Sequence, residues 1–514
     1  MRPSRADLRL APAALAAWAA ALAVVAMPVG GAFVLGVSAA VGAGLVGVVV
    51  VVGRRGGSTS TAPVQAGSVP GGLGQVLLVL LAVAGVALGG AAQLGIREGG
   101  LLGALVDQRA TARVVGTVRS EPVPLASPAS WGDREERYRL ELAVEQVTGR
   151  GRVGSAAAPV LVLAGPAWAR VAYGARLEAT GRLEPAGRGE SVVALFVVRG
   201  SPRPVDPPGA VNRVVGRIRV ALLTATDRLA PDPRGLVPGI AVGDTSRLPA
   251  DLNDAMRVAG LTHVTAVSGA HFAIIGASVL GLTGLVGLPR RARVGVVAAA
   301  MGGFVLLVHP EPSVLRAAVM GAVGVGGLLL GRPSRAMPAL GVTVIALLVA
   351  DPWLARSFGF VLSVLATAGI VLLTVPIARG LARVVPERVG IAIAVPLAAQ
   401  SACAPVVVLL TPALATYAVP ANLAVALALA PATVLGVLAA LVAPWWAFGG
   451  AVLAQGAGWA AAWIAWVARG CAGLPGAQLP WPGGPGGAAL LAAVTVAAGI
   501  AVVHRDRIRQ SLVP

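Results

Sequence analysis

The chain has 514 residues, of which 56% are hydrophobic and 12% are charged. Soluble domains carry about 25% charged residues, and one hydrophobic core rarely serves more than about 250–300 residues, so this composition excludes an ordinary water-soluble protein. The 41 basic residues are all arginine and outnumber the 22 acidic ones, and the absence of lysine excludes a P-loop, a Schiff base and a Ser–Lys dyad.

The first region, residues 1–107, contains three apolar runs, each close to the length that crosses a bilayer. They lie at residues 10–27, 32–52 and 73–92. The first run resembles a signal peptide, but the second follows at once without a convincing cleavage site, so both are predicted to be spans. Arginines at 2–9 and at 54–55 place the N-terminus and the loop after the second span in the cytoplasm by the positive-inside rule. The third span then carries the chain to the far side.

Residues 108–200 have a different texture, with frequent charges and alternating apolar positions. Tyr138, Leu140, Leu142 and Val144 alternate with polar or small residues, which is typical of a half-buried strand. Five strands are predicted, at 112–120, 138–144, 159–164, 175–183 and 191–199. About five short strands in ~90 residues fit a small all-β barrel such as an OB-fold. We expect this OB-like domain to be extracytoplasmic.

The predicted barrel carries thirteen arginines and nine acidic residues, a net charge of +4. Arginines on cytoplasmic loops explain much of the chain's basic excess, but that rule gives no reason for an excess outside. The barrel therefore favours an anionic partner, contacted through phosphates because aromatic residues for base stacking are scarce. The candidate contact residues are Arg113, Arg119, Arg137, Arg139, Arg150 and Arg152, with Arg213 and Arg217 on the helix that follows.

Residues 201–262 are predicted to hold a linker and amphipathic helices. Pro202 to Pro208 would form a stiff linker. Apolar residues between 211 and 229 share one helical face, which fits either a helix in the membrane interface or a helix packed on the barrel. A second helix is predicted from Pro249 to Ala259, with Gly260 as its stop.

Residues 263–504 contain nine further apolar runs. They lie at 263–288, 294–308, 315–330, 338–350, 358–375, 391–410, 422–442, 451–468 and 488–503. Arginine clusters at 290–293, 332–335, 379–388 and in the tail 505–514 all fall in the cytoplasm when the chain is threaded from an outside barrel. The fold class predicted is a polytopic α-helical membrane protein of about 10–12 spans, some of them re-entrant, with an inserted OB-like domain.

No metal site or other cofactor is predicted. The four histidines lack the spacing of a ligand pair, and the two cysteines, Cys403 and Cys471, form no Cys-x-x-Cys motif. Ser268 and His271 share a helical face, but no nearby acid could orient the imidazole, so pore lining or interhelical hydrogen bonding is preferred to a catalytic pair. Asp244 lies in a Gly-flanked turn, where local capping is the simplest role.

Three polar residues in other apolar runs are also candidates. Arg316 could pair with Glu311, extend to the interface or contact a phosphate. Gln400 and Asn422 fit interhelical hydrogen bonding or pore lining.

Several segments, taken in order, resemble the ComEC-type DNA-uptake channel family of bacterial natural competence. They are GDTS (243–246), GLTHVTAVSGAHFAII (260–275), PSVLRAAVM (312–320), FVLSVLATAGI (360–370), QSACAPVVV (400–408) and PANLAVA (420–426). By matching position, the signature residues of the channel domain are Asp244, His263, Ser268, His271, Arg316, Gln400 and Asn422.

The resemblance implies a plasma-membrane channel that passes one DNA strand inward, with single-stranded DNA, a surface DNA receptor and a cytoplasmic DNA helicase as partners. Our leading hypothesis is a passive pore with no enzyme activity in this chain. Membrane lipids are expected contacts; the alternatives for the pore are a monomer or a homodimer, and those for nuclease activity are a separate nuclease, its absence, or a role of this chain other than uptake. The chain departs from many family members because it ends without a metallo-β-lactamase-like domain, has Ala270 and Val361 where other residues are common, and lacks a cysteine pair in the barrel.

Two other hypotheses stand beside this one. The first is a membrane-embedded transporter or enzyme for a small anionic or lipid-linked substrate, with Ser268 and His271 in its site. The second is a structural scaffold, in which the arginines of the barrel would bind no DNA.

Overall fold

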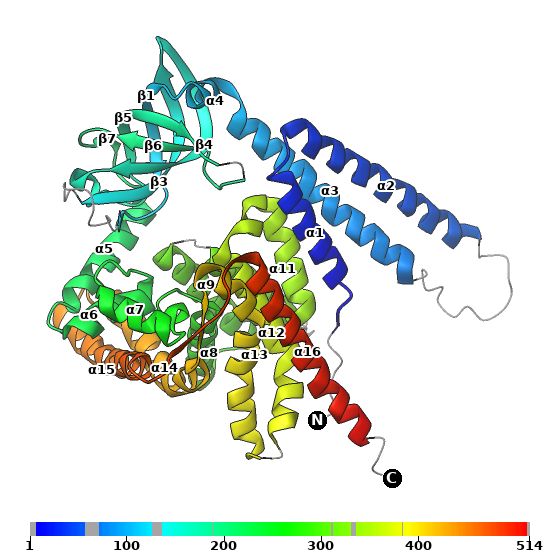
Figure 1. The fold of residues 1–514 in the computed structure, drawn as a ribbon. Helices are drawn as coiled ribbons and strands as arrows, with labels where there is room; N and C mark the ends of the chain where they lie inside the picture. The colour runs from blue at the N-terminus through cyan, green and yellow to red at the C-terminus, as the bar shows by residue number, and fades with distance from the viewer. Residues whose placement is uncertain are drawn as a thin grey trace. The chain divides into compact units, whose positions relative to one another are not determined.

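A computed structural model describes residues 7–56, 71–125, 136–187, 189–309, 312–329, 336–382 and 384–510 (Figure 1). Of the residues discussed above, Arg2, Arg5, Glu311, Arg332 and Arg335 lie outside them. The chain divides into two compact units. The barrel unit comprises Ala11–Arg217 and Val344–Arg356, and the helical unit comprises Met1–Leu10, Ile218–Thr343 and Ser357–Pro514.

The apolar runs predicted from the sequence all form helices. Among the described residues, seven helices are long and apolar enough to cross a membrane: α2 (Val29–Gly56), α3 (Gly71–Glu98), α9 (Arg290–Val308), α12 (Phe358–Leu381), α13 (Glu387–Leu410), α14 (Ala418–Val442) and α15 (Ala447–Ala472). Five more contain shorter apolar stretches of described residues: α1 (Ala11–Val24), α8 (Gly269–Leu285), α10 (Pro312–Leu329, apolar over Val314–Val323), α11 (Ala336–Ala350) and α16 (Gly484–Gln510, apolar over Gly484–Ile500). The polytopic fold class is therefore confirmed, with seven candidate spans where about 10–12 spans were predicted.

Small residues let the helices of the helical unit pack closely. The buried face of α15 is formed largely by alanine and glycine, including Ala454, Ala457, Gly458 and Ala461. Close approach of this kind is how membrane helices gain van der Waals contact where lipid removes the hydrophobic driving force. The opposite face of α15 is aromatic and exposed, with Trp459 71% and Trp466 66% accessible.

Three shorter helices precede this bundle. They are α5 (Ala210–Ala225), α6 (Pro231–Val242) and α7 (Ala250–Val258). The predicted amphipathic helix corresponds to α5 and the second predicted helix to α7, but α6 was not predicted because its prolines and glycines read as a loop. Burial overrides that local preference: every residue from Gly235 to Val242 is buried.

The barrel unit contains a closed sheet. Its strands are β1 (Thr111–Val118), β2 (Val123–Leu125), β3 (Arg137–Gly149), β4 (Arg152–Ala164), β5 (Arg176–Pro185), β6 (Ala194–Val198) and β7 (Arg203–Asp206). The order runs β1-β3-β4-β6-β5, and β5 pairs back with β1, which closes the barrel. All neighbours on this path are antiparallel except β4 and β6, which are parallel. The inserted β domain is thus confirmed, and its OB-like character remains a prediction.

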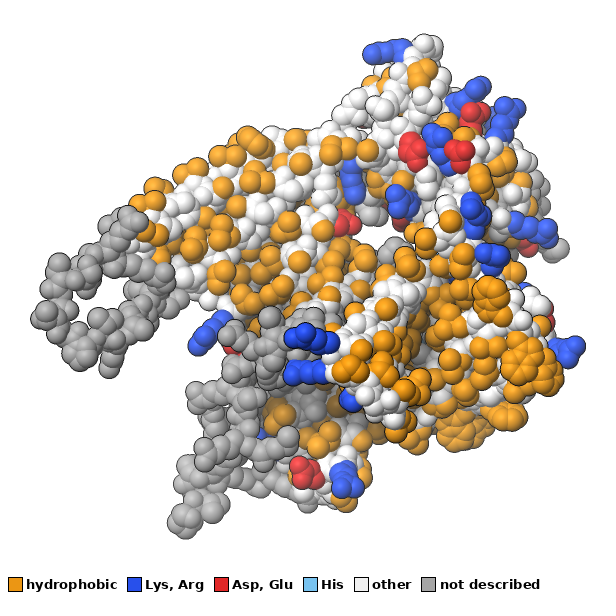
Figure 2. Space-filling view, turned by 180° about the vertical axis from the view of Figure 1, so that it is seen from behind, with side chains coloured by type: hydrophobic (Ala, Val, Ile, Leu, Met, Phe, Trp, Pro, Cys, Tyr) orange, Lys and Arg blue, Asp and Glu red, His pale blue; other side chains and the backbone are white. Residues whose placement is uncertain are grey.

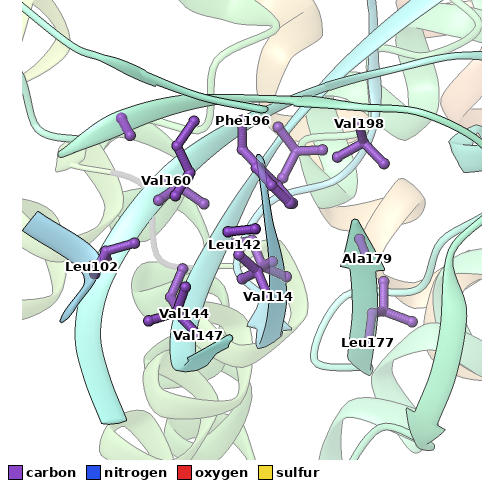
Figure 3. Close-up of a cluster of buried hydrophobic side chains, with 14 of the residues drawn as sticks. Leu102, Val114, Leu142, Val144, Val147, Val160, Leu177, Ala179, Phe196 and Val198 are labelled. Carbon is purple, nitrogen blue, oxygen red and sulfur yellow. The ribbon is translucent and has the colours of Figure 1, made fainter. Parts of the chain in front are cut away.

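The alternating apolar residues of the strands fill the barrel, as Figure 3 shows for Leu142, Val160 and Phe196, each fully buried. A short helix, α4 (Gly100–Asp107), adds Leu102 and Leu105 to this core and was missed by sequence reasoning. Gly149 permits the contact, because a Cβ there would lie 2.8 Å from Leu105.

The prediction that Pro202 to Pro208 forms a stiff linker is wrong for part of that segment. Residues Arg203–Asp206 form β7, which pairs with β5, instead of a stiff connection. Pairing overrides the prolines because Pro204 sits in an edge strand, where a missing N–H is tolerated. Arg176 of β5 reinforces this edge by binding Asp206 at 3.1 Å.

Residues Val344–Arg356 join the barrel unit through α1 and α3. The indole of Trp18 donates a hydrogen bond to the carbonyl of Ala355 at 3.2 Å, and Gln93 donates one to the carbonyl of Ala350 at 2.8 Å. The Arg97 guanidinium lies 3.4 Å from the ring centre of Trp353, a cation–π contact. Trp353 is therefore a buried packing residue.

Candidate functional site

The GDTS segment forms the turn after α6. Gly243 ends the helix with φ of +73°, a conformation that favours glycine, and a Cβ there would lie 3.3 Å from Val308. Its N–H donates to the carbonyl of Gly239, and the N–H of Asp244 donates to that of Pro238. The turn is therefore closed by backbone bonds before any side chain contributes.

Asp244 is buried in this turn with only 7% of its surface accessible. Its Oδ1 accepts the N–H of Ser246 at 2.9 Å, and its Oδ2 lies 3.8 Å from Nη2 of Arg219. The local cap predicted for Asp244 is thus accompanied by an ion pair that sequence spacing could not reveal. A buried pair of this kind requires both partners, since removing one leaves an uncompensated charge.

Arg219 is the residue that sequence reasoning missed. It is 5% accessible and its Nη1 donates to the carbonyls of Val242 and Leu307, near the ends of α6 and α9. These carbonyls belong to the last turns of their helices, where no intrahelical donor is available. The sequence does contain a signal for this burial. Arg219 lies four residues after Val215 and three before Leu222, which places it on the apolar face of α5.

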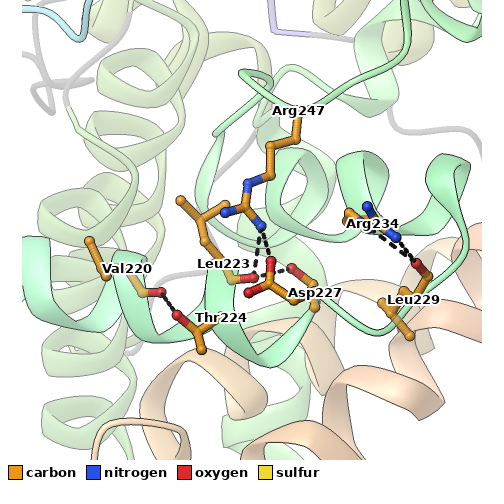
Figure 4. A network of polar contacts seen from close by, with 8 residues as sticks. Val220, Leu223, Thr224, Asp227, Leu229, Arg234 and Arg247 are labelled. Atoms are coloured by element: carbon orange, nitrogen blue, oxygen red, sulfur yellow. Dashed lines mark hydrogen bonds and ion pairs between the residues drawn. The ribbon is translucent and has the colours of Figure 1, made fainter. Parts of the chain in front are cut away.

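Further arginines tie α5 to its neighbours (Figure 4). Arg247 donates to Asp227 at 2.6 Å and to the carbonyl of Leu223 at 2.9 Å. Arg234 donates twice to the carbonyl of Leu229. These contacts hold the segment after α5 against α6 and the turn.

Arg469 joins three helices of the same unit. From the last turn of α15 it binds Asp232 of α6 through two bonds of 2.8 Å and Asp251 of α7 through a third of 2.8 Å. Each charge complements the helix dipole at its position, with acids at two N-termini and the arginine at a C-terminus. The helices on both sides of the Asp244 turn are therefore fixed to one side chain.

A pocket of about 190 Å³ opens beside the turn. Its lining consists of Gly243, Thr245, Thr265, Ala266, Val267 and Val308. The first two residues come from GDTS and the next three from the second matched segment. The pocket is thus formed mainly by the two segments that carried the family resemblance.

Ser268 and His271 lie together at the start of α8. His271 Nδ1 accepts the backbone N–H of Ser268 at 3.1 Å and lies 3.1 Å from its hydroxyl, which makes a reciprocal cap of the helix. His271 is fully buried, and its Nε2 has no hydrogen-bond partner among the described residues. The same nitrogen that would activate Ser268 is thus occupied in capping, and no carboxylate of the described residues orients the ring.

Arg316 occupies a second buried site, between α10 and α12. Its Nε donates to Ser363 at 2.7 Å and its Nη1 to Thr367 at 3.0 Å. It is 5% accessible, and within the described ranges no carboxylate lies within 4 Å of it. Extension of the side chain to the interface is therefore excluded.

The remaining signature residues are dispersed. His263 lies in the turn before α8, beside the side chain of Asn422 and the backbone of Gly260. Asn422 also donates to the carbonyl of Ala418 at 2.8 Å. Gln400 is half-buried on α13 and makes no recorded hydrogen bond within the described part of the chain.

The candidate arginines of the barrel do not form one patch. Arg137 and Arg139 begin β3, whereas Arg150 and Arg152 follow its other end, about 40 Å away at ~3.3 Å per residue. Arginines and acids are mixed over the barrel surface (Figure 2). Arg113, for example, lies 3.8 Å from Glu178.

Five of the candidates are exposed and, among the residues the structure describes, have no acid within 4 Å. They are Arg119, Arg137, Arg139, Arg150 and Arg152. On α5, Arg217 is also exposed, and Arg213 donates to the carbonyl of Pro208 at 2.8 Å. In the described ranges no three His, Cys, Asp or Glu residues gather as a metal site would require.

Comparison with known proteins places these features in a family context. Residues 240–506 match the family described as Competence protein, and all seven signature residues fall inside that range. ComE operon protein 3 of Bacillus subtilis (strain 168) is 30% identical over 144 residues, which is 28% of this chain. The matched part spans only 19% of that protein. No solved structure matches the chain.

Proposed function

The chain belongs to the competence protein family, and on that premise we propose that it is a plasma-membrane channel for single-stranded DNA in natural transformation. The observation that carries this proposal is the overlap between the matched residues 240–506 and the buried polar groups of the helical unit. Charged and polar groups inside membrane helices commonly mark the path of a polar substrate. Arg316 of α10 is such a group, and Asp244 is a second buried charge within the matched residues; each is at most 7% accessible.

The barrel would collect the strand outside the membrane. Its five exposed arginines that have no acid within 4 Å among the described residues offer phosphate contacts near both ends of β3. Phosphate contacts carry no sequence information, which suits a protein that must accept any DNA. In this proposal the N- and C-termini lie in the cytoplasm, a surface receptor supplies the strand, a cytoplasmic helicase pulls it, and a separate polypeptide supplies any nuclease.

The test is uptake by the purified full chain in lipid vesicles. Labelled single-stranded DNA added outside should become resistant to nuclease only in vesicles that contain the protein. Deletion of the protein from a competent host should likewise abolish transformation. Protein-containing vesicles that protect no DNA, or unchanged transformation in the deletion strain, would refute the proposal.

A second candidate is favoured by the 190 Å³ pocket, which is lined in part by Thr265, Ala266 and Val267 just before Ser268. This is a transporter or enzyme for a small anionic or lipid-linked substrate. Hydrolysis or movement of such a substrate by the purified protein, lost in His271→Ala, would support it over the channel.

A further inference from the structure

Arg316 is held in a fixed orientation by two hydroxyl groups of α12. Ser363 and Thr367 are one helical turn apart and accept from Nε and Nη1. The Thr367 hydroxyl donates its own proton to the carbonyl of Ser363 at 2.9 Å, so its oxygen is left to accept from the guanidinium. Met320 adds a sulfur contact at 3.1 Å. The arginine is therefore positioned by its neighbours while its charge is left intact.

None of these partners is an anion. Hydroxyl and thioether groups satisfy hydrogen bonds but do not neutralise a guanidinium, and the part of the chain that the structure describes places no carboxylate within 4 Å of it. The side chain is 5% accessible. A buried cation without a counter-charge is expensive in a membrane helix bundle and is seldom retained for packing alone. Arg219 shows the contrast, since its charge is matched by Asp244.

The unused edge of the guanidinium lies against the start of α8. A Cβ at Gly269, the first residue of that helix, would lie 3.3 Å from Nη2 of Arg316, and Nη2 makes no hydrogen bond to any described residue. The first turn of a helix carries free N–H groups and a partial positive charge. A cation and a helix N-terminus repel one another unless an anion lies beside them.

The same helical turn contains a second buried polar group without a partner. His271 Nδ1 accepts the N–H of Ser268, so the ring proton lies on Nε2, which is buried and makes no hydrogen bond among the described residues. Buried donors without acceptors are rare in folded proteins, and each one calls for a ligand, a water or an ion.

We infer that Arg316 binds a backbone phosphodiester of the DNA strand beside the start of α8. This inference rests on the proposed channel function and assigns one contact within it. A guanidinium presents N–H donors whose geometry matches phosphate oxygens. In Arg316, Nε and Nη1 already donate to hydroxyl groups of α12. Nη2 is therefore the principal donor left for the ligand. The chemistry required of the ligand is an anionic oxygen on a phosphodiester, which DNA and phospholipids share.

The experiment compares full-length wild type with Arg316→Gln, in vesicles of phosphate-free galactolipid and in phospholipid vesicles. Two oligonucleotide probes are used, one with phosphodiester linkages and one with neutral methylphosphonate linkages, and both binding and uptake are measured. Arg316→Gln should lower binding and uptake of the phosphodiester probe at least about tenfold, as loss of a charge-assisted hydrogen bond predicts, in either lipid. The neutral probe should be unaffected by the substitution.

Two further variants control for folding. Arg316→Lys keeps the charge and should recover part of the phosphodiester uptake. Arg293→Gln removes an arginine that donates to the carbonyl of Leu288 at 2.7 Å and should behave as wild type. Equal losses for both probes in Arg316→Gln would show a structural role and overturn the inference.

The remaining outcomes separate the inference from the function on which it rests. An Arg316 effect seen only in phospholipid would assign the site to lipid, and no effect in any condition would leave Arg316 without a ligand role; either result overturns the inference. If the wild-type protein binds the strand but does not take it up, the channel function is refuted. The binding measurement with Arg316→Gln then still tests the proposed phosphate contact. Wild type that neither binds nor takes up DNA would refute both.

Discussion

The two units of this protein use arginine in opposite ways. On the barrel, arginines stand on the surface in alternation with a buried apolar core, and several share an acid, as Arg113 and Arg203 share Glu178. In the helical unit, Arg219 and Arg316 are buried, and each has a distinct set of partners. Surface charges act as a group and substitute for one another, whereas a buried charge has a single position in which it can be satisfied. Single substitutions should therefore be severe in one unit and mild in the other.

The largest expected effect is in Arg219→Leu. The substitution leaves Asp244 without its ion-pair partner and the carbonyls of Val242 and Leu307 without their donor. The free energy of unfolding should therefore fall by about 3–5 kcal/mol. Chemical unfolding of the full chain in mixed micelles, followed by tryptophan fluorescence, measures the change. Arg217→Leu, on the exposed side of the same helix, is the control and should change it by less than about 0.5 kcal/mol. Similar losses in the two variants would break the comparison between buried and exposed arginines.

An intermediate effect is expected from a double substitution on the barrel. Arg150→Gln with Arg152→Gln removes two exposed charges at the β3–β4 turn, so binding of single-stranded DNA should weaken without loss of stability. The dependence of log affinity on log salt should become shallower by about 1.4, since each phosphate contact contributes about 0.7 for a single strand. Arg113→Gln, whose charge faces Glu178, should change the slope less. An unchanged slope in the double variant would remove this turn from the DNA-binding surface.

The smallest effect concerns acid stability of the barrel. The Thr117 hydroxyl, which donates to Glu145 at 2.6 Å, lowers the pKa of that carboxyl, and Arg176 at 2.8 Å lowers it further. A carboxyl with a lowered folded-state pKa stabilises the fold above its unfolded pKa, and this contribution is lost as pH falls through the folded value. Unfolding measured between neutral and acidic pH should thus show a slightly weaker acid dependence in Glu145→Gln than in wild type. A stronger dependence in the variant would contradict the assignment.

Hydrophobic periodicity predicted much of the fold. The apolar runs became helices and the alternating segments became strands, because both patterns depend on neighbours along the chain. β7 and α6 were not predicted because their prolines locally disfavour a strand and a helix. Strand pairing in β7 and burial in α6 outweigh that local preference.

The site was predictable only where partners are near in sequence. Ser268 and His271 are three residues apart and do meet. Arg316 reaches Ser363 and Thr367 across 47 and 51 residues, and Arg219 meets Asp244 on another element, so no spacing rule could connect them. The matching segments located Asp244 and Arg316, while only the fold supplies their partners.

Because Arg469 binds both α6 and α7, it restricts the movement of the turn between them. With the first residues of both helices bound to one guanidinium, the stretch from Asp232 to Asp251 is a ring closed by side chains. The two ends of this ring stay together while the ion pairs hold. Asp244 can therefore be displaced only by rotation about backbone torsions within the ring or by breaking the ion pairs with Arg469 of α15. Any opening of the adjoining pocket is thereby linked to the three bonds that Arg469 makes at the N-termini of those helices.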